Sequence, residues 1–578
     1  MQRTFAAFAK LKPARKRAAP DGTRPRLARL LRLPRRLVAE RLLLWLKVRL
    51  LLLRPPAWLS RQTPTRQPLH MVPDAWPGRA AEGQAIVEGR FRLLGRTLAD
   101  PQPPFRPLGA ELGWQEALNG FGWLVDLRAL GGDQARRRAR ELVALWIDEE
   151  SRWSPAAWAP AVIGRRLSAW LGHYEFYAVS AEVPFQQAVL ASIARQARLL
   201  ARLLPAGLAG ADAIAAIKGL ALAGIACAEG EPWLAWAARL LERELPCQVL
   251  SDGGQAERSP AKHLEVLRDL VDLRSAFHAA GAAVPTALGD AIEQMAPVLR
   301  LLLHGDGAAA LFNGSGECDA LTAELVLQRA SARQRPLLSA PQSGFQRLQA
   351  GRLAVIVDAG RPPPPGLDVE AAAGTLAFEV SLGRERMIVN CGAHAGDPAW
   401  RQALRATAAH STLTLADHNS SELVPDGGLG RRPESVTCRR EENDGDLWLD
   451  LSHDGYRPRF GVTHHRRLYL DATGDDLRGE ERLEGGGKGL PFTLRFHLHP
   501  QVQASLAQGG GAALLRLPRG GGWRLRARGA EMSLETSVYL PEAGPPRRTL
   551  QLVLSGETQS GATLVQWALQ REGRQARR

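Results

Sequence analysis

Residues 366–422 read GLDVEAAAGTLAFEVSLGRERMIVNCGAHAGDPAWRQALRATAAHSTLTLADHNSSE, and this stretch decides the fold. Apolar and polar residues alternate from Thr375 to Cys391, and Leu382-Gly383-Arg384 interrupts the alternation. The pattern predicts a β-hairpin, followed by a tight turn at Gly392. The segment AAHSTLTL then predicts a further strand that carries His410 at its start.

The alternation of apolar and polar residues continues through the C-terminal half. From about Ser343 onward, short alternating segments are separated by Gly and Pro, as in RLAVIVDAG, LWLDLSHDGY, THHRRLYLDA and RTLQLVLSG. Strands that recur at intervals of roughly ten residues with such punctuation are typical of a β-sandwich.

The preceding part of the chain has helical periodicity. Residues 84–98 predict a short β-hairpin, and apolar residues then recur at three- and four-residue spacing over 133–150, 164–179, 185–204, 213–228, 232–245, 257–280, 287–303 and 321–332. Pro and Gly separate these segments. Antiparallel helix pairs with short connections predict a solenoid or toroid.

Three motifs, together with this order of halves, resemble the heparinase II/III-like polysaccharide lyases over about residues 80–560. Residues 252–263, DGGQAERSPAKH, are similar to the family's DGG-x-x-E-R/Q-S-P-x-Y-H signature. Residues 410–413, HSTL, resemble its H-N/S-T-hydrophobic strand, and residues 453–456 read HDGY. The resemblance implies an α+β multidomain chain: an N-terminal α/α toroid followed by a C-terminal antiparallel β-sandwich. We assign residues 1–72 to a basic arm, 80–335 to the toroid and 340–572 to the sandwich.

The family resemblance implies a polysaccharide lyase that cleaves an acidic, uronate-containing glycan by β-elimination. That chemistry needs a group that neutralises the carboxylate, a base and an acid. The candidate catalytic residues are His410, Tyr456, His263, Arg258, Glu257 and Lys262. If the family architecture holds, His410, Tyr456, Arg258 and His263 should face one cleft between the domains.

Several positions depart from the family pattern. Ala211 and Asp212 stand where the family has Asn-His, Lys262 stands at the tyrosine position, and Glu370, Ala372 and Asn390 replace two histidines and an aspartate. A second hypothesis is therefore a catalytically silent relative that binds an acidic glycan in the interdomain cleft. On that hypothesis, Glu257 and Arg258 form a buried pair that ties down a loop, and Tyr456 is a structural tyrosine at a strand end.

The sequence predicts no cofactor and no metal. A zinc site needs about three protein ligands, and Ala372 and Asn390 do not supply them. The five cysteines lie far apart and predict buried thiols rather than a disulfide framework. The GGG runs lie between strands with no following helix, and no G-x-S-x-G motif occurs.

The formal net charge of +16 is concentrated at the N-terminus. Residues 1–70 hold 18 Lys and Arg against Asp21 and Glu40, so the remaining body is neutral. Two hypotheses fit this arm: residues 1–60 contact an anionic membrane surface through an amphipathic helix, or the helix docks on the body with its Leu side inward. Nucleic acid is not an expected partner, because aromatic residues are nearly absent from the arm.

The location of the protein has two readings as well. The family resemblance implies the cell envelope or periplasm. The apolar segment 42–53 is too short and too charged to span a bilayer, and no small-residue cleavage site follows it. A cytoplasmic or membrane-peripheral location is therefore the alternative.

Overall fold

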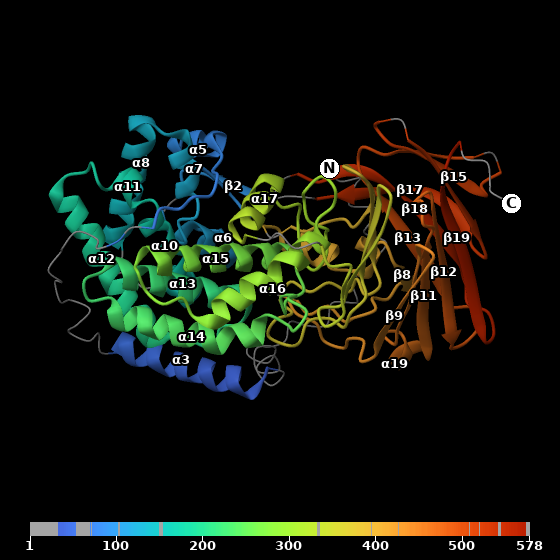
Figure 1. Cartoon of the computed structure of the whole chain (residues 1–578), viewed down its shortest axis with the longest axis horizontal. Coiled ribbons are helices and arrows are strands. Elements are labelled where there is room, and N and C mark those ends of the chain that lie inside the picture. The colour runs from blue at the N-terminus through green and yellow to red at the C-terminus, as the bar shows by residue number, and fades with distance from the viewer. Residues whose placement is uncertain are drawn as a thin grey trace.

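The structure is a computed structural model that describes residues 33–53, 70 and 72–573, apart from 102–103, 150–153, 332–335, 395, 426, 508, 520 and 541–544. Helices form one end of the molecule and two β-sheets form the other (Figure 1). This arrangement confirms the predicted toroid followed by an antiparallel β-sandwich. Residues 1–32 and 54–69, which make up most of the basic arm, lie outside the described residues.

All eight predicted helical segments contain helix, although the segment 164–179 is divided between two helices that meet at His173. The toroid comprises α5 (Ala80–Val87), α6 (Leu112–Asn119), α7 (Leu124–Leu130), α8 (Gly132–Glu149), α9 (Pro155–Trp158), α10 (Pro160–Gly172), α11 (Tyr174–Tyr177), α12 (Val183–Leu203), α13 (Gly210–Ala226), α14 (Glu231–Gln248), α15 (Pro260–Ala279), α16 (Thr286–Leu302) and α17 (Ala320–Arg329). The hairpin predicted over 84–98 is partly wrong. Its first residues belong to α5, and only β1 (Arg90–Leu93) and β2 (Arg96–Ala99) pair.

The apolar faces of these helices close over one core. Phe121, Trp146 and Trp170 lie at its centre, where the Trp170 ring meets each of the other two edge-on with centroids 5.3 Å apart. Local sequence fixes the start of α15, because the Ser259 hydroxyl accepts the Lys262 N–H and Pro260 occupies the first turn. Helix ends and core contacts therefore follow from ordinary capping and amphipathic patterning.

The C-terminal half is a two-sheet sandwich whose paired strands run antiparallel. One sheet has the order β14-β15-β16-β19-β12-β11-β10-β9, and the other has the order β17-β18-β13-β7-β6-β5-β4-β3, with β8 paired to β13. The strands are β3 (Ser339–Ala340), β4 (Phe345–Ala350), β5 (Leu353–Asp358), β6 (Phe378–Leu382), β7 (Glu385–Val389), β8 (Leu413–Leu415), β9 (Val436–Asn443), β10 (Asp446–His453), β11 (Val462–Leu470), β12 (Asp476–Gly485), β13 (Pro491–Leu498), β14 (Gln503–Leu506), β15 (Ala512–Arg516), β16 (Gly522–Arg528), β17 (Glu531–Tyr539), β18 (Arg547–Glu557) and β19 (Ala562–Arg571).

The hairpin predicted in the opening stretch is confirmed. Strands β6 and β7 pair across Gly383, with Leu382 opposite Glu385. Both strands are buried along their whole length, because the toroid covers the face of this sheet that the other sheet does not (Figure 1). Two short helices, α18 (Pro398–Leu404) and α19 (Arg457–Phe460), lie in the connections of the sandwich.

The N-terminal helix α3 (Arg35–Leu53) lies along the underside of the toroid, next to α14 (Figure 1). Leu37 is buried against the body, the Arg41 guanidinium donates to the Gly207 carbonyl at 3.1 Å, and the Lys47 ammonium donates to the Arg202 carbonyl at 2.7 Å. Docking on the body, the second hypothesis for this segment, therefore describes one face of the helix.

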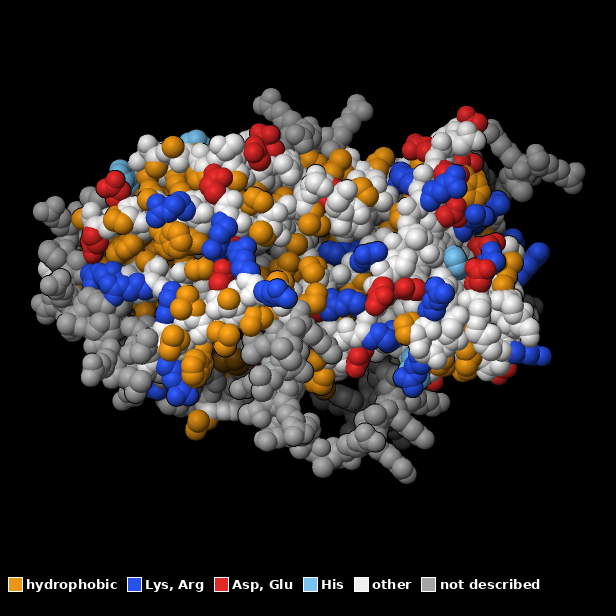
Figure 2. All heavy atoms as spheres, turned by 90° about the horizontal axis from the view of Figure 1, so that it is seen from below, with side chains coloured by type: hydrophobic (Ala, Val, Ile, Leu, Met, Phe, Trp, Pro, Cys, Tyr) orange, Lys and Arg blue, Asp and Glu red, His pale blue; other side chains and the backbone are white. Residues whose placement is uncertain are grey.

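The opposite face of α3 is apolar and exposed. Leu42, Leu43, Trp45 and Leu46 are 47–58% exposed. The view from below shows hydrophobic side chains interspersed with Lys and Arg over the helical half of the molecule (Figure 2). Among the described residues, no helix is both long enough and apolar enough to cross a membrane.

Candidate functional site

A cavity of about 450 Å³ lies inside the toroid. Its lining comes from the segment 72–77 and from α7, α10, α13 and α15, with a contribution from α17. All lining residues fall between positions 72 and 322, so this cavity belongs to the helical half. The sequence predicted a ligand cleft between the two domains instead.

A close crossing of α10 and α13 builds one wall of the cavity. A Cβ at Gly219 would lie 2.3 Å from the Gly164 carbonyl oxygen, so glycine at both positions lets the two backbones touch. Arg165 and Lys218, the neighbours of these glycines in sequence, both line the cavity. The two helices therefore deliver one cation each to the same space.

Carboxylates outnumber cations around this cavity. Its lining contains five carboxylates, Asp74, Asp126, Glu265, Asp269 and Asp272, and three cations, Arg165, Lys218 and Arg268. The Lys218 ammonium lies 2.8 Å from Asp269 and 2.5 Å from Asp272. Burial opposes the charged form of Lys218, but these two carboxylates outweigh it and raise its pKa. Lys218 is therefore a fixed cation.

Two polar groups in the lining lack a hydrogen bond within the described ranges. Burial opposes the charge of Arg268, but Asp269, Asp272, Glu265 and Asp74 outweigh it and raise its pKa. Among the described residues, the Arg268 side chain makes no hydrogen bond or ion pair, and its Nε is fully buried. The Nδ1 of His173, a residue that is 2% exposed, is buried without a hydrogen-bond partner. The indole rings of Trp76 and Trp123 form apolar walls beside them. A buried donor that lacks a protein partner is usually satisfied by water or by a ligand.

Beside the cavity, Asp212 and Lys262 occupy the positions where the family has its imidazole and phenol, and Ala211 occupies the position of its amide. Arg165 lies 2.6 Å from Asp212 and 3.3 Å from Glu265, and Lys262 lies 2.6 Å from Glu265. Glu265 raises the pKa of Lys262 despite burial. Burial opposes the charged form of Glu265, but Lys262 and Arg165 outweigh it and lower its pKa. Lys262 is therefore held protonated and Glu265 ionised, and neither is suited to exchange a proton near neutral pH.

Glu257 and Arg258 point in different directions. The Glu257 carboxylate accepts the Ala211 N–H at 2.8 Å and so caps the N-terminus of α13. The Arg258 guanidinium reaches the sandwich, where it lies 2.5 Å from Asp358 and donates to the Ser343 carbonyl. Arg258 does tie down a loop, as one hypothesis held, but its ionic partner is Asp358 rather than Glu257.

The remaining predicted residues are interior groups. The His263 Nε2 lies 2.9 Å from the Met295 carbonyl oxygen inside the toroid. The His410 Nδ1 lies 2.9 Å from the Ala406 carbonyl oxygen, and the Tyr456 hydroxyl donates to the Leu413 carbonyl at 2.7 Å. With Arg258, these three side chains are 1–6% exposed, so the structure does not bring the four together on one open cleft. Their hydrogen bonds are those of structural residues.

Glu370 and Asn390, which stand at the positions of a family histidine and the family aspartate, also make contacts with other residues of the sandwich. Glu370 lies 2.5 Å from Arg401, and the Asn390 side-chain oxygen accepts the Ser411 N–H at 2.9 Å. Within the described ranges, no group of three or more His, Cys, Asp or Glu side chains could hold a metal ion.

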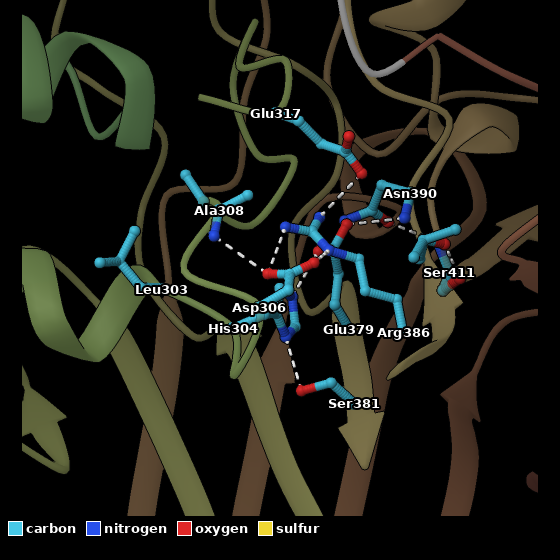
Figure 3. Close-up of polar contacts among 12 residues, drawn as sticks. Leu303, His304, Asp306, Ala308, Glu317, Glu379, Ser381, Arg386, Asn390 and Ser411 are labelled. Atoms are coloured by element: carbon cyan, nitrogen blue, oxygen red, sulfur yellow. Dashed lines mark hydrogen bonds and ion pairs between the residues drawn. The ribbon is translucent and has the colours of Figure 1, made fainter. Parts of the chain in front are cut away.

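Instead, a buried polar network joins the loop after α16 to the hairpin β6–β7 (Figure 3). The His304 imidazole lies 2.9 Å from both Glu379 and Ser381, and the Arg386 guanidinium donates to Asp306 at 2.8 Å. Burial raises the pKa of Glu379 to about 7 and lowers the pKa of His304 well below its usual value. The network fixes the sandwich against the toroid.

No sequence motif pointed to Arg268, His173, Trp76 or Trp123. One signal was present: Lys262, Glu265, Asp269 and Asp272 recur at three- and four-residue spacing in α15 and share one face of that helix. A charged stripe within a helix of the inner toroid indicates a polar lumen. The tryptophans come from segments too short to show a period.

Comparison with known proteins assigns the family. The model of the heparinase II/III N-terminus matches residues 139–329, and that of the heparinase II/III-like C-terminal region matches residues 332–568. A relative from Caulobacter vibrioides, FtsZ-localized protein C, is 33% identical over 521 residues, which is 86% of this chain and 89% of the relative. The chain belongs to the heparinase II/III-like family.

Solved structures of polysaccharide lyases share the fold. Heparinase III matches with a TM-score of 0.71 at 15% identity, covering 89% of this chain and 88% of that one. A heparan sulfate lyase from Pedobacter heparinus matches with a TM-score of 0.56 at 16% identity, covering 93% and 89%. The Streptomyces coelicolor A3 chondroitin AC lyase, in complex with chondroitin sulphate, gives 0.53 at 11% identity, covering 86% and 79%. At these identities the likeness concerns the fold alone.

Proposed function

We propose that this heparinase II/III-like chain binds an acidic glycan without cleaving it by β-elimination. The observation that carries the proposal is the pair of ion pairs at the positions of the family's imidazole and phenol. Asp212 is held by Arg165, and Lys262 is held by Glu265. Elimination needs a base whose pKa lies near the working pH, and the pKa shifts of Lys262 and Glu265 both move away from it.

The toroid cavity is the proposed glycan site, in place of the interdomain cleft. The planar guanidinium of Arg268 can bind a carboxylate through two hydrogen bonds, and the Trp76 and Trp123 rings can pack on the apolar faces of a sugar. Because carboxylates outnumber cations here, a uronate chain with separated charges suits the cavity better than a densely sulfated one. None of the six residues predicted from sequence lines this cavity, and Lys262 is linked to it through its ion pair with Glu265.

Binding of a galacturonate trisaccharide tests this assignment. We expect Arg268→Gln to weaken binding at least about 10-fold, because a charge-assisted bidentate contact is lost. Arg137→Gln, an exposed change on α8, is the matched control and should leave affinity unchanged. Calorimetric titration gives both affinities. Equal affinity of the Arg268→Gln protein and wild type would contradict the cavity assignment.

We also propose that the exposed face of α3 contacts an anionic membrane surface. The support is the apolar group Leu42, Leu43, Trp45 and Leu46 on a basic helix whose other face is fixed to the toroid. This favours the membrane-peripheral location over the periplasmic one. We further propose that the chain shares the FtsZ-localized position that its relative's name records, because the similarity spans most of both chains.

Flotation with phosphatidylglycerol vesicles tests the membrane proposal. Changing Leu42, Leu43, Trp45 and Leu46 together to Ser should reduce vesicle binding at least about 10-fold, since their apolar area drives insertion. The melting temperature should move little, because these side chains are exposed. The matched control changes four other exposed apolar residues, Leu108, Leu112, Val179 and Val183, to Ser. An equal loss in the control, or no loss in the α3 variant, would refute the proposal.

A further inference from the structure

The eight-stranded sheet turns one face to solvent at the end of the molecule away from the toroid (Figure 1). Leu449, Leu468 and Trp567 point into the sandwich. Burial alternates along each of their strands, so the residues immediately before and after each of them point outward. A hollow of about 850 Å³ opens on this outward side, over β10, β11, β12, β19 and β16. At the usual strand spacing, these five strands span about 19 Å.

Strand register arranges the outward side chains in rows across the sheet. One row runs Trp448, Tyr469, Arg478, Ala568 and Arg526, each opposite the next. Ala568 lies between Arg478 and Arg526 in this row. Because its side chain is short, it leaves the space that forms the hollow. The Trp448 and Tyr469 rings lie 4.3 Å apart between centroids and form an aromatic platform at one end.

Positive charge dominates the hollow, unlike the toroid cavity. Its lining contains Arg467, Arg478, Arg526 and Arg528 against the single carboxylate of Glu480. Arg467 and Arg478 already pair with Asp450 and Asp476. The side chains of Arg526 and Arg528 are exposed and, within the described part of the chain, make no hydrogen bond or ion pair. The amide of Gln570 adds hydrogen-bonding groups in the same lining.

We propose that this outer sheet face is a second binding site, for a chain of acidic polysaccharide that crosses the strands. Aromatic rings pack on sugar faces, and free guanidinium groups bind the carboxylates that repeat along such a chain. An acidic peptide lacks rings to pack on the Trp448–Tyr469 platform, and a nucleic acid would need more stacking residues than this one pair. The site is separate from the toroid cavity and does not depend on it.

Affinity electrophoresis in gels containing polygalacturonate tests the proposal. Polygalacturonate can also enter the toroid cavity, so the variants are compared in an Arg268→Gln background. There, adding Arg526→Gln with Arg528→Gln should weaken the remaining retardation at least about 10-fold. Arg547→Gln with Arg548→Gln removes the same charge from β18 of the other sheet and should leave retardation intact. Gels with poly-glutamate or single-stranded DNA should retard the protein less.

Four results would overturn this assignment. The first is no retardation of wild type by polygalacturonate. The second is a loss in the β18 control as large as in the β16 variant, which would indicate unspecific charge attraction. Complete loss of retardation in the Arg268→Gln protein would move the binding to the toroid cavity. Retardation by poly-glutamate or DNA equal to that by polygalacturonate would show that sugar rings are not recognised.

Discussion

Replacing Arg258 with alanine is expected to lower the free energy of unfolding by about 3–5 kcal/mol. The guanidinium lies 2.5 Å from Asp358 and donates to the carbonyls of Ser343, Gly344 and Arg361. Both partners of the ion pair are at most 6% exposed. Removing Arg258 therefore leaves a buried carboxylate without its ionic partner and the Ser343 and Arg361 carbonyls without this donor, whereas the Gly344 carbonyl still accepts the Ala359 N–H.

Thermal unfolding measures this effect, and we expect the midpoint to fall by roughly 3 °C, because the unfolding entropy of a chain of this length is large. The matched control is Arg467→Ala, which removes an exposed ion pair with Asp450 and should cost at most about 1 kcal/mol. In the double variant Arg258→Ala with Asp358→Ala, the loss should be smaller than the sum of the single losses. A loss in Arg258→Ala no larger than in the control would show that this contact does not hold the two halves together.

Acid is expected to destabilise the protein through buried neutral histidines. Burial lowers the pKa of His263 to about 4 and that of His497 to about 3. The folded form therefore binds fewer protons than the unfolded chain below about pH 6.5, the ordinary histidine value. The contribution of these two histidines to stability should be constant above that pH and should fall as the pH decreases toward about 4 and 3. At pH 5 the loss is about 2 kcal/mol for each histidine.

Urea unfolding at pH 7.5 and pH 5 checks this prediction. His497→Gln should show a smaller difference between the two pH values than wild type, whatever its own stability, because one titrating group has been removed. His465→Gln, on the solvent side of β11, is the control and should keep the wild-type difference. An unchanged difference in His497→Gln would mean that other groups cause the acid sensitivity.

The sequence predicted the architecture better than the site. The alternation from Thr375 to Cys391 and the helical periods reflect burial, which dominates both local pattern and fold, so the hairpin and eight helical segments were confirmed. Strand β9 was missed because Val436–Asn443 is an edge strand with little buried apolar surface. Because most of its side chains are exposed, apolar and polar residues do not have to alternate along it.

Side-chain direction explains why the predicted site residues do not form one site in the structure. Glu257, Arg258, Lys262 and His263 are near neighbours in sequence, yet their side chains reach the start of α13, the sandwich, Glu265 and the toroid core, respectively. A turn with Arg258 at a φ of 53° followed by a helix start sends successive side chains in different directions, which a motif match does not reveal. The absence of the family's polar groups at Ala211, Asp212 and Lys262 was legible in the sequence; the ion pairs of Asp212 and Lys262 required the structure.

The most direct test of glycan binding without elimination is ultraviolet absorbance during incubation with polygalacturonate, heparan sulfate and chondroitin sulfate. β-Elimination creates an unsaturated uronate that absorbs where the substrate does not. We expect no increase in absorbance with any of the three, at protein concentrations at which titration shows the galacturonate trisaccharide to be bound. A steady increase that scales with enzyme concentration and disappears in Lys262→Ala would contradict this account.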